Sequence, residues 1–250
     1  MKTRIRNWIQ TEIEDYKVLM RNIPAIVVTA FVMSVILMNL LANKEIYTGV
    51  PWLALDCGLL ISWLSFLSMD IITKRFGARA SIKISIFATC LNLVVCGVLY
   101  LASSVPGNWG EFYATESEYV NEVLNNTIGG TWYVLLGSSV AFLVSAVFNS
   151  LINAGIGKMM KTDGFCAYAA RSWISTIAAQ FIDNMIFALM VSHVFFGWTL
   201  IQCVTCSLTG CVMELIFQAI FSPFGFRVTQ QWESEKVGQD YLDYANGGKQ

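Results

Sequence analysis

The stretch RSWISTIAAQFIDNMIFALM, residues 171–190, is long and apolar enough to cross a lipid bilayer, yet it contains the carboxylate Asp183. About 20 mostly apolar residues suffice for a spanning helix. From Ser172 to Met213 the chain carries no other formal charge, so this run can form two spans joined by a tight turn at residues 195–199. Because an acid inside a membrane costs about 2.5–3.5 kcal/mol on insertion scales, we expect Asp183 to have a function.

The rest of the chain has the same membrane-like composition. Of its 250 residues 56% are hydrophobic and only 13% are charged, which argues against a water-soluble globular domain. Further runs without charge lie between Arg21 and Lys44, between Lys83 and Glu111, and between Glu122 and Lys158. The sequence therefore predicts an all-α integral membrane protein with six transmembrane helices, near residues 23–42, 52–72, 83–103, 131–152, 173–195 and 199–222.

The distribution of Lys and Arg predicts the orientation of these helices. Basic residues are concentrated before the first helix, after the second, after the fourth and after the sixth, whereas the opposite loops contain only Lys44. Because basic flanks stay in the cytoplasm, we expect a multi-pass cell-membrane protein with both termini cytoplasmic. Residues 1–22 then form a cytoplasmic amphipathic segment, 23–226 the six-helix domain, and 227–250 a polar cytoplasmic tail that we expect to be mobile.

Polar side chains recur at helical spacing within the predicted spans. Ser172, Thr176, Gln180 and Asp183 follow one another at i, i+4, i+8 and i+11, with Asn184 beside them and Phe187 one turn further on. Other helices contribute Asn92, Asn149 and Glu214. Asparagine and glutamine amides within a membrane either bridge helices or bind a ligand, and the pattern alone leaves both roles open. Arg171 begins the stripe, where it can pair with Glu214 or Asp70 or reach a ligand.

Three motifs resemble one known family. MDIITKRFG (69–77), AFLVSAVFNSLI (141–152) and RSWISTIAAQFIDNMIF (171–187) are similar to the signatures of the queuosine precursor transporters, also labelled putative vitamin uptake transporters. With matching order and helix count, the resemblance covers about residues 24–226. Lys74, Arg75 and Asn184 depart from the family pattern, which indicates a divergent member.

The resemblance implies a fold and a substrate class. The fold is that of the substrate-binding components of energy-coupling-factor transporters, and the substrates are 7-deazaguanine bases or nucleosides such as preQ0, preQ1 and queuine. The first helix has only a weak small-x-x-x-small motif, so we expect transport without an energy-coupling-factor module. We expect Phe187, or an aromatic such as Trp63 or Trp132, to stack on the base. The expected substrate-binding residues are Asp183, Asn184, Gln180, Asn149, Arg171, Glu214, Asn92, Phe187 and Asp70.

The sequence also argues against several other functions. The seven cysteines lack the spacing of a closed zinc site, and the single histidine, His193, lies near a helix end. We therefore expect no metal, no cofactor, no nucleic-acid partner and no catalysis. The expected partners are the bilayer and a small molecule, and a homo-oligomer is possible. A transporter of another purine-like base or vitamin, an intramembrane enzyme and a channel or scaffold remain as alternatives.

Overall fold

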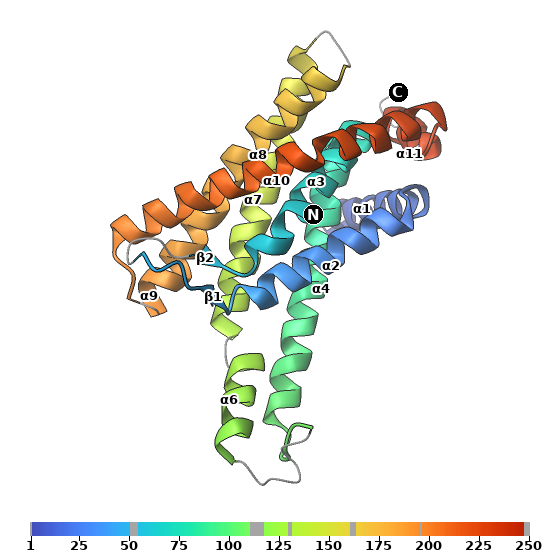
Figure 1. Ribbon diagram of the computed structural model, residues 1–250. Coiled ribbons are helices and arrows are strands. Elements are labelled where there is room, and N and C mark those ends of the chain that lie inside the picture. Colours follow the sequence, from blue (N-terminus) through green and yellow to red (C-terminus); the bar gives the residue numbers. More distant parts are fainter. Residues whose placement is uncertain are drawn as a thin grey trace.

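The computed structural model describes residues 2–50, 55–110, 118–129, 132–160, 164–195 and 197–247, and most of them are helical. A short antiparallel pair of strands joins the second and third helices, with Glu45 opposite Asp56. The elements are α1 (Lys2–Asn22), α2 (Ala25–Leu41), β1 (Glu45–Ile46), β2 (Leu55–Asp56), α3 (Leu59–Phe76), α4 (Ala78–Ser104), α6 (Glu118–Ile128), α7 (Trp132–Met159), α8 (Phe165–Phe187), the π-helical turn η1 (Ala188–Ser192), α9 (His193–Phe195), α10 (Leu200–Ser234) and α11 (Gln239–Gly247) (Figure 1).

Each of the six predicted segments overlaps one long helix, but α3, α4, α7, α8 and α10 extend past the predicted bounds at one end or both. The second one, expected from residue 52, begins at Leu59, because Leu55 and Asp56 pair with β1 instead. Within the part of the chain that the structure describes, four helical stretches can cross a membrane by length and composition: Ala78–Ser104, Tyr119–Met159, Phe165–Phe195 and Leu200–Ser234. A fifth is possible if α1 and α2, which meet at a 108° bend, act together. The chain is therefore an all-α membrane protein, while six crossings remain a prediction.

Helix α10 shows why the bundle belongs in lipid rather than in water. Its outward face exposes large apolar side chains at a spacing of four, including Val204, Leu208, Val212 and Ile216. Its inward face buries Cys203, Ser207, Gly210, Glu214, Gln218 and Ser222. A water-soluble helix has the opposite arrangement. Apolar side chains outside and polar side chains inside are expected where lipid replaces water as the solvent.

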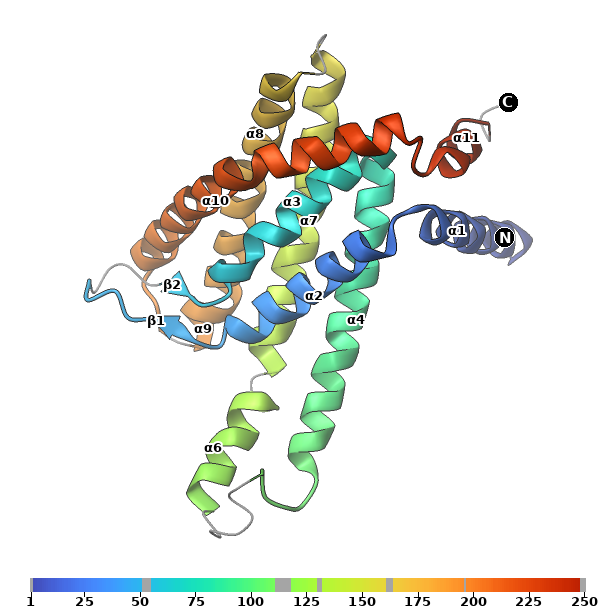
Figure 2. The same cartoon turned by 45° about the vertical axis from the view of Figure 1, so that its right-hand side comes forward.

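Helix α3 lies at the centre of the bundle, where other helices surround its polar side chains. It contacts α2, α4, α7, α8 and α10, and Figure 2 shows it between α2 and α10. Every residue from Ser65 to Thr73 is buried. Protein rather than lipid therefore surrounds Asp70, and the neighbouring helices can supply the hydrogen bonds that a buried acid needs.

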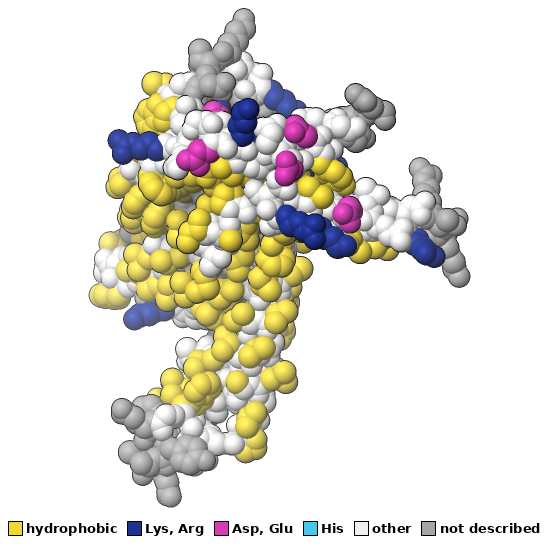
Figure 3. All heavy atoms as spheres, turned by 90° about the vertical axis from the view of Figure 1, so that its right-hand side faces the viewer, with side chains coloured by type: hydrophobic (Ala, Val, Ile, Leu, Met, Phe, Trp, Pro, Cys, Tyr) yellow, Lys and Arg dark blue, Asp and Glu magenta, His cyan; other side chains and the backbone are white. Residues whose placement is uncertain are grey.

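The two termini lie at the same end of the molecule, because α1 packs against α11. Charged side chains gather at this end and on the projecting α1, whereas a broad hydrophobic surface covers the middle and the lower arm (Figure 3). The lower arm contains the far half of α4 with α6 beside it. This distribution agrees with a membrane-embedded body and one polar end.

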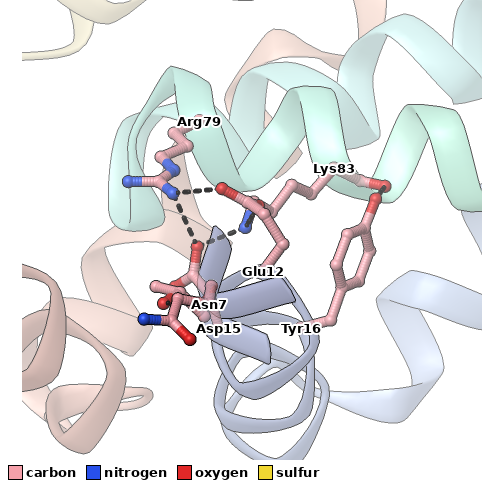
Figure 4. A network of polar contacts seen from close by, with 7 residues as sticks. Asn7, Glu12, Asp15, Tyr16, Arg79 and Lys83 are labelled. Carbon is pink, nitrogen blue, oxygen red and sulfur yellow. Dashed lines mark hydrogen bonds and ion pairs between the residues drawn. The ribbon is translucent and has the colours of Figure 1, made fainter. Parts of the chain in front are cut away.

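The first helix is held to the start of α4 by a network of ion pairs (Figure 4). The Arg79 guanidinium lies 2.9 Å from Glu12 and 3.3 Å from Asp15, and Lys83 Nζ lies 2.6 Å from Glu12 and also pairs with Asp15. The Tyr16 hydroxyl donates a 2.9 Å hydrogen bond to the Lys83 carbonyl. The polar face of α1 is therefore used for packing, while Ile9 and Ile13 remain exposed and available to a membrane surface.

The C-terminal segment is helical over most of its described length. α10 continues to Ser234, and α11 then folds back against Phe76 through Tyr241, which is buried. Gly238 adopts a positive φ of 72°, and a Cβ atom at this position would lie 2.1 Å from the Phe76 ring. Residues 227–247 therefore continue the helical structure and pack against α3 through Phe76.

Candidate functional site

A cavity lies inside the bundle, between α2, β2, α3, α7, α8 and α10. Its walls combine apolar side chains with an unusual number of polar ones for a membrane interior. Its volume is about 60 Å³, which is room for a few water molecules. The polar lining consists of Asp56, Ser62, Ser138, Gln180, Asp183, Asn184 and Glu214.

One wall of this cavity is formed by the last two turns of α8. Gln180, Asp183, Asn184 and Phe187 lie on the same face because residues three and four apart are neighbours on a helix. Immediately after Phe187 the helix widens into the π-helical turn η1. Such turns are rare and are often found at functional sites. The sequence stripe on α8 thus becomes one continuous polar wall.

Asp183 lies at the centre of this wall with little hydrogen-bonding support. Its Oδ1 atom lies 3.0 Å from the Ser145 hydroxyl of α7. That hydroxyl also lies 2.9 Å from the Phe142 carbonyl, and it has only one proton to donate. Asp183 is partly exposed because it faces the cavity. Its carboxylate therefore has acceptor capacity left for a ligand.

Glu214 and Gln180 also present polar atoms to the cavity. The Ser62 hydroxyl donates to Glu214 Oε1, whereas Glu214 Oε2 has no hydrogen-bond partner, although the residue is only 2% exposed. Gln180 is likewise 2% exposed, and its Nε2 atom has no partner. Because a buried polar atom without a partner costs about 1–3 kcal/mol, these two atoms indicate a site built to hold something else.

Two glycines allow the walls to approach one another. A Cβ atom at Gly210 of α10 would lie 2.4 Å from Asn184 Nδ2, so any side chain at this position would force the Asn184 amide to move. At Gly58 a Cβ atom would lie 2.7 Å from the Met38 carbonyl and 2.8 Å from Asp56 Oδ1. The Gly58 amide donates a 2.7 Å hydrogen bond to the same Asp56 oxygen. Both glycines therefore set the positions of polar groups in the cavity wall.

A second buried acid, Asp70, lies in a different environment nearer the polar end. Its Oδ1 atom accepts hydrogen bonds from Asn149 Nδ2 at 3.0 Å and from Asn153 Nδ2 at 2.8 Å. Its Oδ2 atom accepts from Gln218 Nε2 at 2.8 Å and from the Ser172 hydroxyl. Asp70 is fully buried and lies close enough to Arg171 to be attracted to it. We call these residues the Asp70 cluster.

The predicted site residues are thus divided between different places. Gln180, Asp183, Asn184, Phe187 and Glu214 line the cavity. Asp70, Asn149 and Arg171 belong to the Asp70 cluster, and Asn92 donates a 2.8 Å hydrogen bond to Ser139 between α4 and α7. The structure does not bring these four residues to the cavity wall.

The aromatic partners also differ from expectation. Trp63 stacks on Phe221 at a centroid distance of 3.9 Å, and Trp132 is half exposed beside Tyr133. Neither side chain lines the cavity, whereas Phe187 does. The sequence could not show which face of α3 lines the cavity, because polar and apolar side chains occur all around this helix.

Asp56, Ser62 and Ser138 line the cavity but were missed as site residues. Asp56 was visible in the sequence as a charge interrupting the second span. Its role depends on the pairing of β2 with β1, which turns residues 55–58 back toward the bundle. A charge inside an apolar run was the available signal, and we assigned it no role in the site.

The described residues contain no group of three or more His, Cys, Asp or Glu side chains arranged to hold a metal ion. No curated protein and no solved structure matches the chain. The profile of one family, described as "Putative vitamin uptake transporter", matches residues 56–228. These residues include β2, α3, α7, α8 and most of α10, which provide nearly all of the cavity wall. The chain therefore belongs to the putative vitamin uptake transporter family.

Proposed function

We propose that this protein is a membrane transporter for the uptake of queuosine precursors, and that it binds the 7-deazaguanine base in the cavity beside Asp183. The observation that carries the proposal is a polar cavity enclosed in an apolar bundle, with Gln180 Nε2 and Glu214 Oε2 buried and lacking partners. Family membership supports transport of a small molecule, and the motif resemblance supports this substrate class.

The chemistry of the α8 wall suits a guanine-like edge. Such an edge presents two parallel N–H donors, and one carboxylate can accept both in a bidentate contact. Asp183 has the acceptor capacity for this contact. Gln180 and Asn184 lie within two turns of it and provide amide donors and acceptors for the carbonyl and the ring nitrogens. Phe187 offers an apolar ring face for stacking, which contributes about 1–3 kcal/mol per base.

The size of the cavity implies that it widens on binding. A volume of about 60 Å³ is below the roughly 300–1,000 Å³ that is usual for sites of drug-sized ligands. The wall formed by β2 and the start of α3 is the element best placed to move, since it is held by a short two-residue strand pair. Movement of this wall fits a transporter, which must alternate between closed and open arrangements of one site.

A binding experiment tests this function. Purified protein is heated in detergent with a panel of 7-deazaguanines, purines and vitamins, and the melting temperature is recorded for each. A ligand at 100 times its Kd stabilises the native state by about 2.7 kcal/mol, so binding is readily visible. We expect the deazaguanines to raise the melting temperature. If another purine-like base or a vitamin raises the melting temperature and deazaguanines do not, the protein remains a transporter but the proposed substrate is wrong.

We further propose that both termini are cytoplasmic and that the protein works without an energy-coupling-factor module. The shared location of α1 and α11 at the charged end supports an even number of crossings. Single cysteines are introduced at Lys158 and at Glu122, both exposed, in a background without native cysteines. An impermeant maleimide added to intact cells should label position 122 and spare position 158. Labelling of position 158 but not of position 122 would mean that the orientation is the opposite of the one proposed.

A further inference from the structure

The cavity brings three carboxylates together from three different elements. Asp56 comes from β2, Asp183 from α8 and Glu214 from α10. They lie close enough for Asp56 to repel Asp183 electrostatically and for both to repel Glu214. Among the described residues that line the cavity there is no Lys, Arg or His. The protein itself therefore places no basic side chain in this lining.

The cavity also has few hydrogen-bond donors for these acids. Asp56 accepts from the Gly58 amide, and Glu214 Oε1 accepts from Ser62, but Glu214 Oε2 has no partner. The Ser62 hydroxyl also lies 3.2 Å from the Leu59 carbonyl, so its one proton is shared between two acceptors. Glu214 lines the cavity, so a ligand bound there can supply the hydrogen-bond donor that Oε2 lacks.

A guanine-like edge supplies some of the missing hydrogen-bond donors but no positive charge. It donates two N–H groups to Asp183, yet it adds no positive charge, so the repulsion among the three acids remains. Opposite charge within about 4–6 Å is what favours ionised carboxylates in a protein interior. A ligand that carries an ammonium group would supply both the charge and up to three N–H donors.

The arrangement of the walls suggests where each part of such a ligand lies. Gln180, Asp183, Asn184 and Phe187 form one wall from a single helix and suit the flat base. Asp56, Ser62 and Glu214 belong to β2, α3 and α10 and provide the remaining acceptors. An amine attached to the base by a short arm can reach these acceptors while the base edge stays on α8.

We infer that the cavity selects a base bearing a protonated amine arm and discriminates against bases of the same shape without a positive charge. The inference rests on the proposed function and makes its substrate class more specific. The ammonium group lies among Asp56, Glu214 and the Ser62 hydroxyl, and the ring edge lies on Asp183.

The test compares two ligands that share one ring. Affinities of the purified protein are measured for 7-aminomethyl-7-deazaguanine, which is cationic, and 7-cyano-7-deazaguanine, which is neutral. We expect the cationic compound to bind at least about tenfold more tightly, because it makes one additional buried contact between opposite charges. Equal affinities, or tighter binding of the nitrile, would overturn the inference while leaving the proposed function in place.

Two variants locate the charge contact. Glu214→Gln and Asp56→Asn should each reduce the preference for the cationic compound several-fold, whatever their effect on the affinity for the nitrile. A cooperative ligand-free melting transition shows that each variant is folded. Glu122→Gln, at an exposed site on α6, is the matched control and should change neither affinity. An unchanged preference in both cavity variants would mean that these acids do not contact the amine, and the inference would fail.

If neither deazaguanine binds, the proposed function fails and the charge inference is decided on another pair of ring compounds. Thiamine, a flat-ring cation, and riboflavin, a neutral ring vitamin, are then compared in the same melting assay. A rise with thiamine that Glu214→Gln removes would support selection by charge. A rise with riboflavin alone, or with neither compound, would contradict it.

Discussion

Asp70 and Asp183 are both carboxylates inside the same bundle, but their surroundings are opposite. Asp70 receives hydrogen bonds from Asn149, Asn153, Gln218 and Ser172, and Arg171 lies near enough to attract it. Asp183 shares one serine hydroxyl and faces two other acids across a cavity. A buried acid with all its acceptors satisfied braces helices, whereas one with spare acceptors is available to a ligand.

A single helix connects the two environments. On α8, Ser172 belongs to the Asp70 cluster, and Asp183, 11 residues further along and about 16 Å away at 1.5 Å per residue, belongs to the cavity. The same polar stripe therefore serves packing at one end and binding at the other. Position along the helix, rather than residue type, separates the two roles.

The largest expected effect is that of Asp70→Ala on stability. The substitution leaves two asparagine amides, one glutamine amide and a serine hydroxyl without their common acceptor. We expect a loss of about 3–5 kcal/mol in the free energy of unfolding, as for breaking a buried charged contact. Unfolding in denaturant measures the loss, with Asp183→Ala as the comparison. An Asp70→Ala protein as stable as the wild type would mean that the cluster does not brace the bundle.

An intermediate effect is expected for Gly210→Ala, which alters the cavity without changing a charge. The added methyl would lie 2.4 Å from Asn184 Nδ2, so the amide must move away from α10. Overpacking of this kind costs about 1–3 kcal/mol. We expect the cost to appear mainly as weaker ligand binding, measured by calorimetry. Gly155→Ala, where a Cβ meets nothing within 4 Å, is the control. If both variants bind the ligand with equal affinity, Asn184 does not belong to the binding site.

The smallest effect concerns a third charged region, in which basic residues meet the acids. The hydrogen bond from Lys83, with further attraction from Lys83 and Arg79, holds the pKa of Glu12 below its usual value of 4.5. A lowered pKa stabilises the folded state above the unfolded pKa, and this stabilisation is lost as the pH falls through the folded value. Because Glu12 is partly exposed, the contribution is at most about 1 kcal/mol.

The measurement for Glu12 is the melting temperature as a function of pH, compared between the wild type and Glu12→Gln. We expect the wild type to be slightly more stable above about pH 5 and the two curves to converge at lower pH. Glu14→Gln, on an exposed side of α1, should leave the wild-type profile unchanged. A constant offset at all pH values would indicate that packing, not charge, holds α1 to α4.

The sequence was sufficient for the long helices and for the cavity wall on α8. Helical periodicity is a local property, so Gln180, Asp183, Asn184 and Phe187 could be placed on one face before any tertiary contact was known. The apolar lengths likewise predicted the helical segments, although the β1–β2 pair delayed the start of α3 to Leu59.

Contacts between helices could not be predicted in the same way. Asn149 occupies a polar face of α7, as expected, but its rotation and depth relative to α3 place it on Asp70 instead of the cavity. Arg171 had two possible acidic partners, and only the packing of α8 against α3 brings it near Asp70. Asp56 lines the cavity because β2 pairs with β1, and this strand pair is too short to be recognised from the sequence.

The central claim is that Asp183 binds the ligand while Asp70 braces the bundle, and one paired measurement tests it. Asp183→Asn and Asp70→Asn are each assayed for ligand-free melting temperature and for affinity toward the 7-deazaguanine that binds the wild type best. For Asp183→Asn we expect a loss of about 2–5 kcal/mol in binding, roughly 30- to several-thousand-fold, with the ligand-free melting temperature unchanged or higher. For Asp70→Asn we expect a lower melting temperature and near-normal affinity. Normal binding by Asp183→Asn, or a reversal in which Asp70→Asn loses only binding and Asp183→Asn only stability, would contradict the account.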